Sequence, residues 1–140
     1  MKVGEKMTKN MVTVNITATA AEAAKKMQSE KVGTVLVLDG WVLKGLVTDR
    51  QIATRVVASG KDPAKVGVSE FMTKNPVTVS PEMDIHEAVR VMGAQGYRRI
   101  PVLEGEKLVG IISVADIAEH AQTCNLCMQN IFKELKKAER

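Results

Sequence analysis

Residues 7–14 read MTKNMVTV and residues 72–79 read MTKNPVTV, with a single change at the fifth position. The same offset of 65 residues (72 − 7) aligns residues 3–53 with residues 68–118 without a gap, and 19 of these 51 positions are identical. An internal repeat at a constant offset determines the fold ahead of any single element. We therefore expect two copies of one unit, packed face to face around a cleft with two related sites.

The composition is ordinary for a globular protein, with 45% hydrophobic and 26% charged residues in a chain of 140. Each copy has about 60 residues, too few to bury a comfortable core alone, so the copies are expected to share one. No apolar run approaches the ~20 residues that cross a bilayer, and the N-terminus lacks a secretory signal. Two cysteines form no disulfide framework. These features predict a cytoplasmic protein with no membrane partner.

The charge balance is mildly basic, with a net charge of +4 and a pI near 9.1. Such a balance favours an anionic partner. Part of the excess lies in the tail KELKKAER at 133–140, which is more typical of a solvated helix face. Aromatic residues make up 3% of the chain, too few for platforms that stack single-stranded nucleic acid. A nucleic-acid partner is therefore disfavoured.

Each copy has the pattern strand, helix, strand, strand, helix. Short β-branched strands are predicted at 12–14 and 77–79. In the second copy, Ser80 is expected to cap the next helix, with Pro81 at its first position. Apolar stripes at three-to-four spacing predict the buried face of this helix; they comprise Ala20, Ala23, Ala24 and Met27 in copy one, and Ile85, Ala88, Val89 and Met92 in copy two.

The middle strand of the unit is a nearly continuous apolar run, at 35–38 in copy one and 100–103 in copy two. Such a run is typical of a strand buried on both faces. The turn signals Asp39-Gly40 and Glu104-Gly105 come next. Strands are predicted at 35–38, 43–47, 100–103 and 108–112, and second helices at about 49–58 and 115–122.

These elements predict an α+β fold of two β-α-β-β-α repeats, packed as a pseudo-twofold pair with a shared core. Helix breakers and polar residues at 59–63 mark the break between the copies. The predicted organisation is repeat 1 at 1–60, a linker at 61–64, repeat 2 at 65–122 and a C-terminal helical tail at 123–140.

The repeated words resemble the CBS domain, the small module named for cystathionine β-synthase. The matching pieces are MTKNPVTVSP, YRRIPVLEGEKLVG and GIISVADI in copy two, and MTKNMVTV, VGTVLVLDGWVLKG and GLVTDRQI in copy one. The resemblance covers residues 1 to about 122. It implies a tandem pair, commonly a homodimer, whose cleft binds an adenosine-containing ligand such as AMP, ADP, ATP or S-adenosylmethionine. It implies no chemistry catalysed by the module itself.

The end of copy two is the strongest candidate site. A strand ends and a helix begins between Gly110 and Asp116, and unpaired N–H groups at a helix start attract phosphate. Ser113 adds a hydroxyl donor, and Asp116 can accept both hydroxyls of a ribose; the resemblance gives the two residues these roles. The alternative is that they only cap the helix.

The resemblance implies a wider set around this turn. Arg98 and Arg99 precede the middle strand, where arginine forks suit phosphate oxygens, unless both are ordinary surface residues. The adenine slot would be crossed between copies, and its apolar members are also ordinary core candidates. The predicted site A comprises Met7, Val12, Val32, Gly33, Arg98, Arg99, Ile111, Ser113 and Asp116.

The corresponding site in copy one departs from the pattern. Thr48 keeps the hydroxyl, but Gln51 stands where the carboxylate belongs, and a neutral amide lacks charge-assisted acceptor strength. Arg50 and Arg55 favour a phosphate-rich ligand, unless they form a solvated helix face. The predicted site B comprises Leu46, Thr48, Arg50, Gln51, Arg55, Met72, Val77, Tyr97 and Arg98.

A metal- or redox-responsive module is the alternative function. His120, Cys124 and Cys127 share one face of a continued helix, but a structural zinc usually needs four ligands. Packing of two small side chains is the favoured reading, and zinc analysis of the protein separates the two.

The sequence thus predicts a regulatory, ligand-sensing module that binds an adenosine nucleotide and signals through a conformational or partner change. No nucleophile–base or acid–base pair is visible, so an enzyme is disfavoured. No cofactor is required, the nucleotide being the regulatory ligand, and the output is expected to pass through a protein partner.

Overall fold

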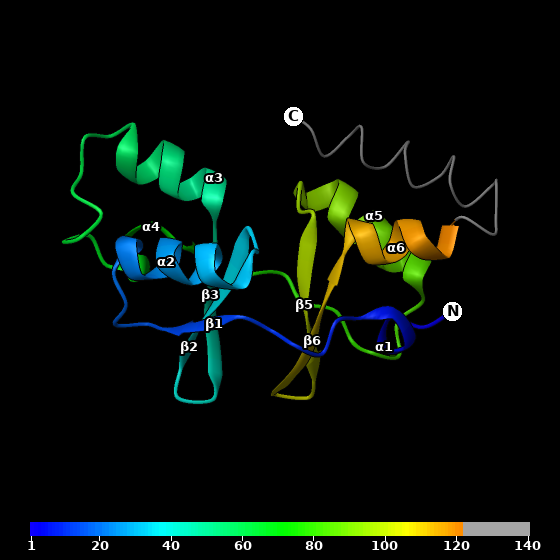
Figure 1. Cartoon of the computed structure of the whole chain (residues 1–140). Helices are drawn as coiled ribbons and strands as arrows, with labels where there is room; N and C mark the ends of the chain where they lie inside the picture. Colours follow the sequence, from blue (N-terminus) through cyan, green and yellow to red (C-terminus); the bar gives the residue numbers. More distant parts are fainter. Residues whose placement is uncertain (122–140) are drawn as a thin grey trace. The chain divides into compact units, whose positions relative to one another are not determined.

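The computed structural model describes residues 1–121, which form two compact units (Figure 1). Unit 1 joins Met1–Asn10 to the chain from Val77 onward, and unit 2 is Met11–Pro76. The opening segment of each sequence repeat therefore folds with the body of the other repeat. The boundaries of the structural units therefore differ from the boundaries of the sequence repeats.

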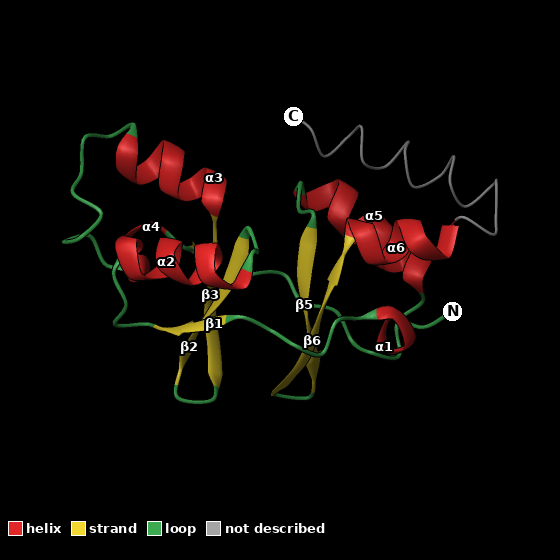
Figure 2. Ribbon diagram, in the orientation of Figure 1, coloured by secondary structure: helices red, strands yellow, loops and turns green. Residues whose placement is uncertain are grey.

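Unit 2 contains a four-stranded sheet of β1 (Thr13–Asn15), β2 (Thr34–Asp39), β3 (Val42–Thr48) and β4 (Thr73–Lys74), in that order. Figure 2 labels β1, β2 and β3 among the strands drawn in yellow. β1 runs parallel to β2, and the other neighbours are antiparallel. β2 is buried from its first residue to its fourth, as predicted from its apolar run. β4 was not predicted; it belongs to the opening segment of the second repeat.

Unit 1 reduces the same arrangement to one hairpin, β5 (Arg99–Glu104) with β6 (Lys107–Ser113). Single bridges replace the two outer strands: Val79 pairs in parallel with Val102, and Thr8 pairs antiparallel with Ile111. The order of segments across unit 1 therefore repeats the order of strands in unit 2.

The strand predicted at 77–79 is wrong, because only the bridge at Val79 forms. In unit 2 the backbone N–H of Leu36 donates to the carbonyl of Val12 at 3.0 Å. The position of Leu36 corresponds to Pro101 in the second repeat (36 + 65), and proline has no N–H to donate. The ladder is thus limited to the two hydrogen bonds between Val79 and the carbonyl of Pro101 and the N–H of Leu103.

The helices of unit 2 are α2 (Ala20–Glu30), α3 (Asp49–Gln51) with the π-helical segment η1 (Ile52–Val57), and α4 (Val68–Phe71). The Thr19 hydroxyl caps α2 by accepting from the N–H of Glu22. The second helix predicted for this repeat is confirmed, although most of it is π-helical.

The helices of unit 1 are α1 (Val3–Lys6), α5 (Ile85–Gln95) and α6 (Val114–Ala121). The predicted cap of α5 is wrong: Asp84, not Ser80, is the N-cap. Ser80 instead begins a turn in which its hydroxyl accepts from the N–H of Glu82 at 3.1 Å.

The four-residue helices α1 and α4 were not predicted. Each is held at its start by a glutamate, since the N–H groups of Lys2 and Gly67 donate to the carboxylates of Glu5 and Glu70. The two glutamates occupy equivalent positions in the repeats (5 + 65).

Each unit has its own hydrophobic cluster, and each cluster draws on both repeats. The unit 1 cluster places Val3 among the predicted stripe of α5 and the inner faces of the hairpin; its buried members are Val3, Val79, Ile85, Ala88, Val89, Met92, Ile100, Val102, Ile112 and Ile117. The unit 2 cluster combines Val68, Phe71 and Met72 with the residues of α2, β2 and β3. Among residues 1–121, no helix is long and apolar enough to cross a membrane.

A central glycine in each hairpin lets the opening segment approach closely. A Cβ built on Gly110 would lie 2.6 Å from Sδ of Met7 and 3.0 Å from the carbonyl oxygen of Thr8. Gly45 meets Met72 and Thr73 in the same way. These glycines are therefore required by packing.

We predict that Gly110→Ala lowers the free energy of unfolding by about 1–3 kcal/mol, the usual cost of overpacking. Chemical denaturation measures the change. Gly67→Ala is the control, because its added Cβ would have no neighbour closer than 3.8 Å and its φ of −78° suits alanine. Equal effects of the two substitutions would contradict the packing argument.

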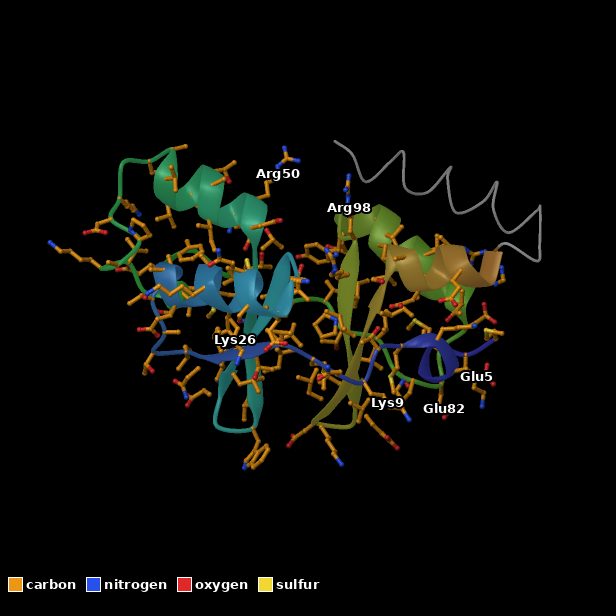
Figure 3. The ribbon with its side chains drawn as sticks, viewed as in Figure 1. Glu5, Lys9, Lys26, Arg50, Glu82 and Arg98 are labelled. Atoms are coloured by element: carbon orange, nitrogen blue, oxygen red, sulfur yellow. The ribbon has the colours of Figure 1, made fainter. Side chains whose placement is uncertain are left out.

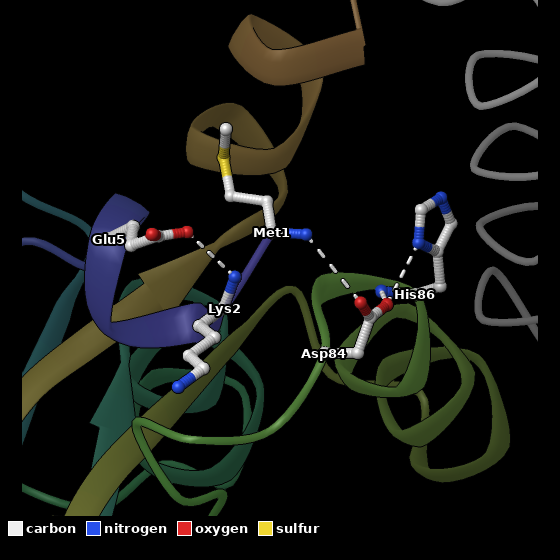
Figure 4. Close-up of polar contacts among 5 residues, drawn as sticks. All are labelled: Met1, Lys2, Glu5, Asp84 and His86. Carbon is white, nitrogen blue, oxygen red and sulfur yellow. Dashed lines mark hydrogen bonds and ion pairs between the residues drawn. The ribbon is translucent and has the colours of Figure 1, made fainter.

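The start of α5 carries a polar cluster that ties down the N-terminus (Figure 4). Asp84 Oδ1 accepts from the backbone N–H of His86 at 2.8 Å and lies 2.9 Å from its Nδ1. The Met1 amino group is 3.6 Å from the other carboxylate oxygen. The pKa of Asp84 is lowered below 3.8, the ordinary value of an aspartate side chain. The main cause is the hydrogen bond from the His86 backbone, and the contact with the His86 side chain contributes less.

This pKa shift predicts the pH range in which the Asp84 charge stabilises the fold. A lowered carboxyl pKa contributes stability that is complete above 3.8 and is lost as the pH falls through the lower pKa of the folded state. Asp84→Asn keeps a capping oxygen, so we expect a loss of only about 0.3–1 kcal/mol at pH 7, screened by salt. Denaturation at several pH values should show the difference vanishing in acid; a difference that persists at pH 2 would contradict it.

Candidate functional site

The turn from β6 into α6 holds the two residues on which the predicted site depends. The backbone N–H and the hydroxyl of Ser113 both donate to Asp116 Oδ2 at 2.9 Å, and the N–H of Asp116 donates to Ser113 Oγ at 3.2 Å. The two residues therefore form a reciprocal cap of α6. This capping role uses one carboxylate oxygen and leaves the other turned away from the cap.

The opening segment of the chain supplies the neighbour of that second oxygen. Thr8 is fixed beside β6 by two backbone hydrogen bonds to Ile111, of 2.8 and 3.0 Å. Its hydroxyl lies 3.4 Å from Asp116 Oδ1, which is long for a hydrogen bond between oxygens. Thr8 was not predicted as a site residue, although its repetition within MTKN was a signal.

Unit 2 builds the same turn with different side chains. The N–H of Thr48 donates to Gln51 Oε1 at 3.2 Å, and the N–H of Gln51 donates to Thr48 Oγ1 at 3.1 Å. Gln51 Nε2 then donates to Thr73 Oγ1 at 2.7 Å. Thr73 is the repeat equivalent of Thr8 (8 + 65). Like Thr8, it was not predicted as a site residue.

The arginines of the two turns differ in their surroundings. Arg98 is exposed just before β5, where it extends outward (Figure 3), and its carbonyl accepts from the N–H of Val114 at 3.0 Å. Arg99 pairs in register with Ser113. Arg50 is exposed on α3, whereas Arg55 donates from Nη1 to the carbonyl of Phe71 at 2.7 Å. Part of the Arg55 guanidinium is thus used for a hydrogen bond within unit 2.

The predicted sets divide between the units. Of site A, unit 1 contains Met7, Arg98, Arg99, Ile111, Ser113 and Asp116, and unit 2 contains Val12, Val32 and Gly33. Of site B, unit 2 contains Leu46, Thr48, Arg50, Gln51, Arg55 and Met72, and unit 1 contains Val77, Tyr97 and Arg98. The structure brings together the polar residues of each turn and the threonine that follows the opening methionine.

The predicted metal alternative falls almost entirely beyond the described chain. Cys124 and Cys127 lie outside residues 1–121, and α6 includes the backbone of His120. Within the described residues, no group of three or more histidine, cysteine, aspartate or glutamate side chains could hold a metal ion.

The sequence of this chain matches the CBS domain family twice, at residues 3–58 and 68–122. The chain belongs to the CBS domain family. The predicted resemblance is thereby confirmed, as is the α+β fold of two repeats. A Bacillus subtilis protein, CBS domain-containing protein YhcV, is 38% identical over 116 residues, which are 83% of this chain and 82% of that protein.

Solved structures of CBS proteins have the same fold. The CBS-domain containing protein ATU1752 from Agrobacterium tumefaciens superimposes with a TM-score of 0.79 at 29% identity, covering 86% of this chain and 98% of that one. The CBS domain pair of protein MJ0100 was solved in complex with 5′-methylthioadenosine and S-adenosyl-L-methionine. It superimposes with a TM-score of 0.79 at 22% identity, covering 88% of this chain and 97% of that one. At that identity the likeness concerns the fold.

Proposed function

We propose that this CBS pair is a regulatory sensor that binds an adenosine-containing nucleotide at the Ser113–Asp116 turn of unit 1. The observation that carries the proposal is the division of labour within the Asp116 carboxylate. Oδ2 makes the cap of α6, whereas within residues 1–121 the contact of Oδ1 is a long one, of 3.4 Å, with Thr8. An ionised carboxylate oxygen accepts hydroxyl donors strongly, so Oδ1 is suited to a ribose.

The phosphate of such a nucleotide would depend on arginine more than on backbone amides. The N–H groups of Ser113, Val114 and Asp116 all have partners within the unit. Arg99 pairs in register with Ser113, and the exposed Arg98 is its neighbour in the chain. A guanidinium group suits phosphate oxygens. The positive end of α6 adds to the same attraction.

Signalling would follow from differential affinity, because a ligand shifts an equilibrium only toward the arrangement that it binds more tightly. The proposal includes a homodimer, a protein partner for the output and no catalysed reaction. The solved MJ0100 pair, in complex with two adenosine-containing compounds, is an example of the fold accommodating ligands of this class.

The direct test is calorimetric titration with AMP, ATP and S-adenosylmethionine. We expect at least one to bind, and Asp116→Ala to weaken binding by about 1.5–3 kcal/mol, because a charge-assisted hydrogen bond is lost. The substitution also removes part of the α6 cap, so the melting temperature is recorded to confirm that the variant is folded at the temperature of the titration.

Glu119→Ala is the matched control for this titration. It removes a carboxylate from the same helix at an exposed position one turn from Asp116, and it should leave affinity unchanged. Failure of all three compounds to bind at millimolar concentration would refute the proposed function. Equal losses in Asp116→Ala and Glu119→Ala would show that Asp116 has no special part in binding.

A further inference from the structure

The turns of the two units begin with a hydroxyl residue, Ser113 or Thr48, and differ at the three positions that follow. The fourth position, Asp116 or Gln51, closes the helix cap in both units. In unit 1 the backbone N–H of Ser113 donates to a carboxylate oxygen of Asp116, and in unit 2 that of Thr48 donates to Gln51 Oε1. A backbone N–H can only donate, so the atom it meets must be an acceptor. The cap therefore fixes which end of the Gln51 amide turns away from the helix.

That outward end is the amide nitrogen, and it is held in place. Gln51 Nε2 donates to Thr73 Oγ1 at 2.7 Å, whereas the equivalent contact between Thr8 and Asp116 Oδ1 is 3.4 Å. The outward atom of unit 2 is thus a tightly bound donor, and that of unit 1 is a loosely contacted, negatively charged acceptor. Both ends of the Gln51 amide are engaged within its own unit.

The difference determines how each turn can meet a ribose. The two ribose hydroxyls need acceptors for their protons, and a neutral N–H₂ group accepts none. A hydroxyl proton buried against that group without a partner costs binding free energy. The turn in unit 2 must in addition break the Gln51–Thr73 hydrogen bond before its amide can turn toward a ligand.

We propose that Gln51, held by Thr73, closes the turn of unit 2 to ribose, so that each chain binds one adenosine nucleotide, at Asp116. Gln51 acts as the specificity-determining residue and Thr73 as the residue that positions it. This inference rests on the proposed function of the Asp116 turn, and it adds the number of ligands and the reason for that number.

The experiment compares four full-length proteins by calorimetric titration with AMP: the wild type, Gln51→Asp, Asp116→Asn and the double variant. We expect one site in the wild type, two in Gln51→Asp, none of comparable affinity in Asp116→Asn, and one in the double variant. Both substitutions keep an oxygen for the cap, because Asp116 itself shows that an aspartate caps this turn, and asparagine has a side-chain carbonyl oxygen that accepts in the same way. Melting temperatures verify that all four proteins are folded.

A nucleotide without ribose hydroxyls separates ribose recognition from general stability. AMP lacking both the 2′ and the 3′ hydroxyl should bind the wild type about tenfold more weakly than AMP. Titration of Gln51→Asp with this nucleotide should show no second binding site. A purely structural role for Gln51 would not distinguish the two nucleotides.

The outcomes separate this inference from the proposed function. Two equivalent AMP sites in the wild type, or a single site in folded Gln51→Asp, would overturn the inference and leave the function of the Asp116 turn standing. If AMP binds none of the four proteins, they are titrated with ATP and S-adenosylmethionine. If none of the three compounds binds to any of the four proteins, the proposed function is overturned as well.

Discussion

Each unit depends on the close contact between a methionine and a glycine at the centre of its hairpin. Met7 lies against Gly110, and Met72 lies against Gly45. Because the methionine comes from the opening segment of the other repeat, neither repeat completes a unit alone. The same contact places the next residue, a threonine, beside the turn that follows the hairpin. Packing of the core and assembly of the candidate site therefore share one constraint.

Much of the fold could be predicted from local sequence. The hairpins β2–β3 and β5–β6 and the buried stripe of α5 follow from apolar runs and helical spacing. Features that depend on distant partners could not be predicted in this way. The exchange of opening segments between the repeats leaves no periodic signal, and neither does the loss of a strand at 77–79, which depends on the missing N–H of Pro101 across the ladder.

The candidate site shows the same division between local and distant information. Spacing alone indicated that Ser113 and Asp116 could cap a helix, and the structure contains that cap. Spacing could not give the roles of Thr8 and Thr73, which lie 108 and 22 residues from their partners. These threonines distinguish the two turns, because one contacts a carboxylate oxygen loosely and the other holds an amide nitrogen firmly. A nearly symmetric duplication thus yields two chemically unequal turns.

In the proposed function, an adenosine nucleotide is recognised at the turn of unit 1 and not at the turn of unit 2. The most direct measurement is the change in backbone amide chemical shifts of the ¹⁵N-labelled protein during titration with AMP, ATP or S-adenosylmethionine. We expect a nucleotide that binds to shift the amide signals of Thr8 and of Ser113–Asp116 in a saturable manner, and to leave those of Thr48–Gln51 and Thr73 much less affected. Shifts centred on Thr48–Gln51, with Ser113–Asp116 unchanged, would contradict it.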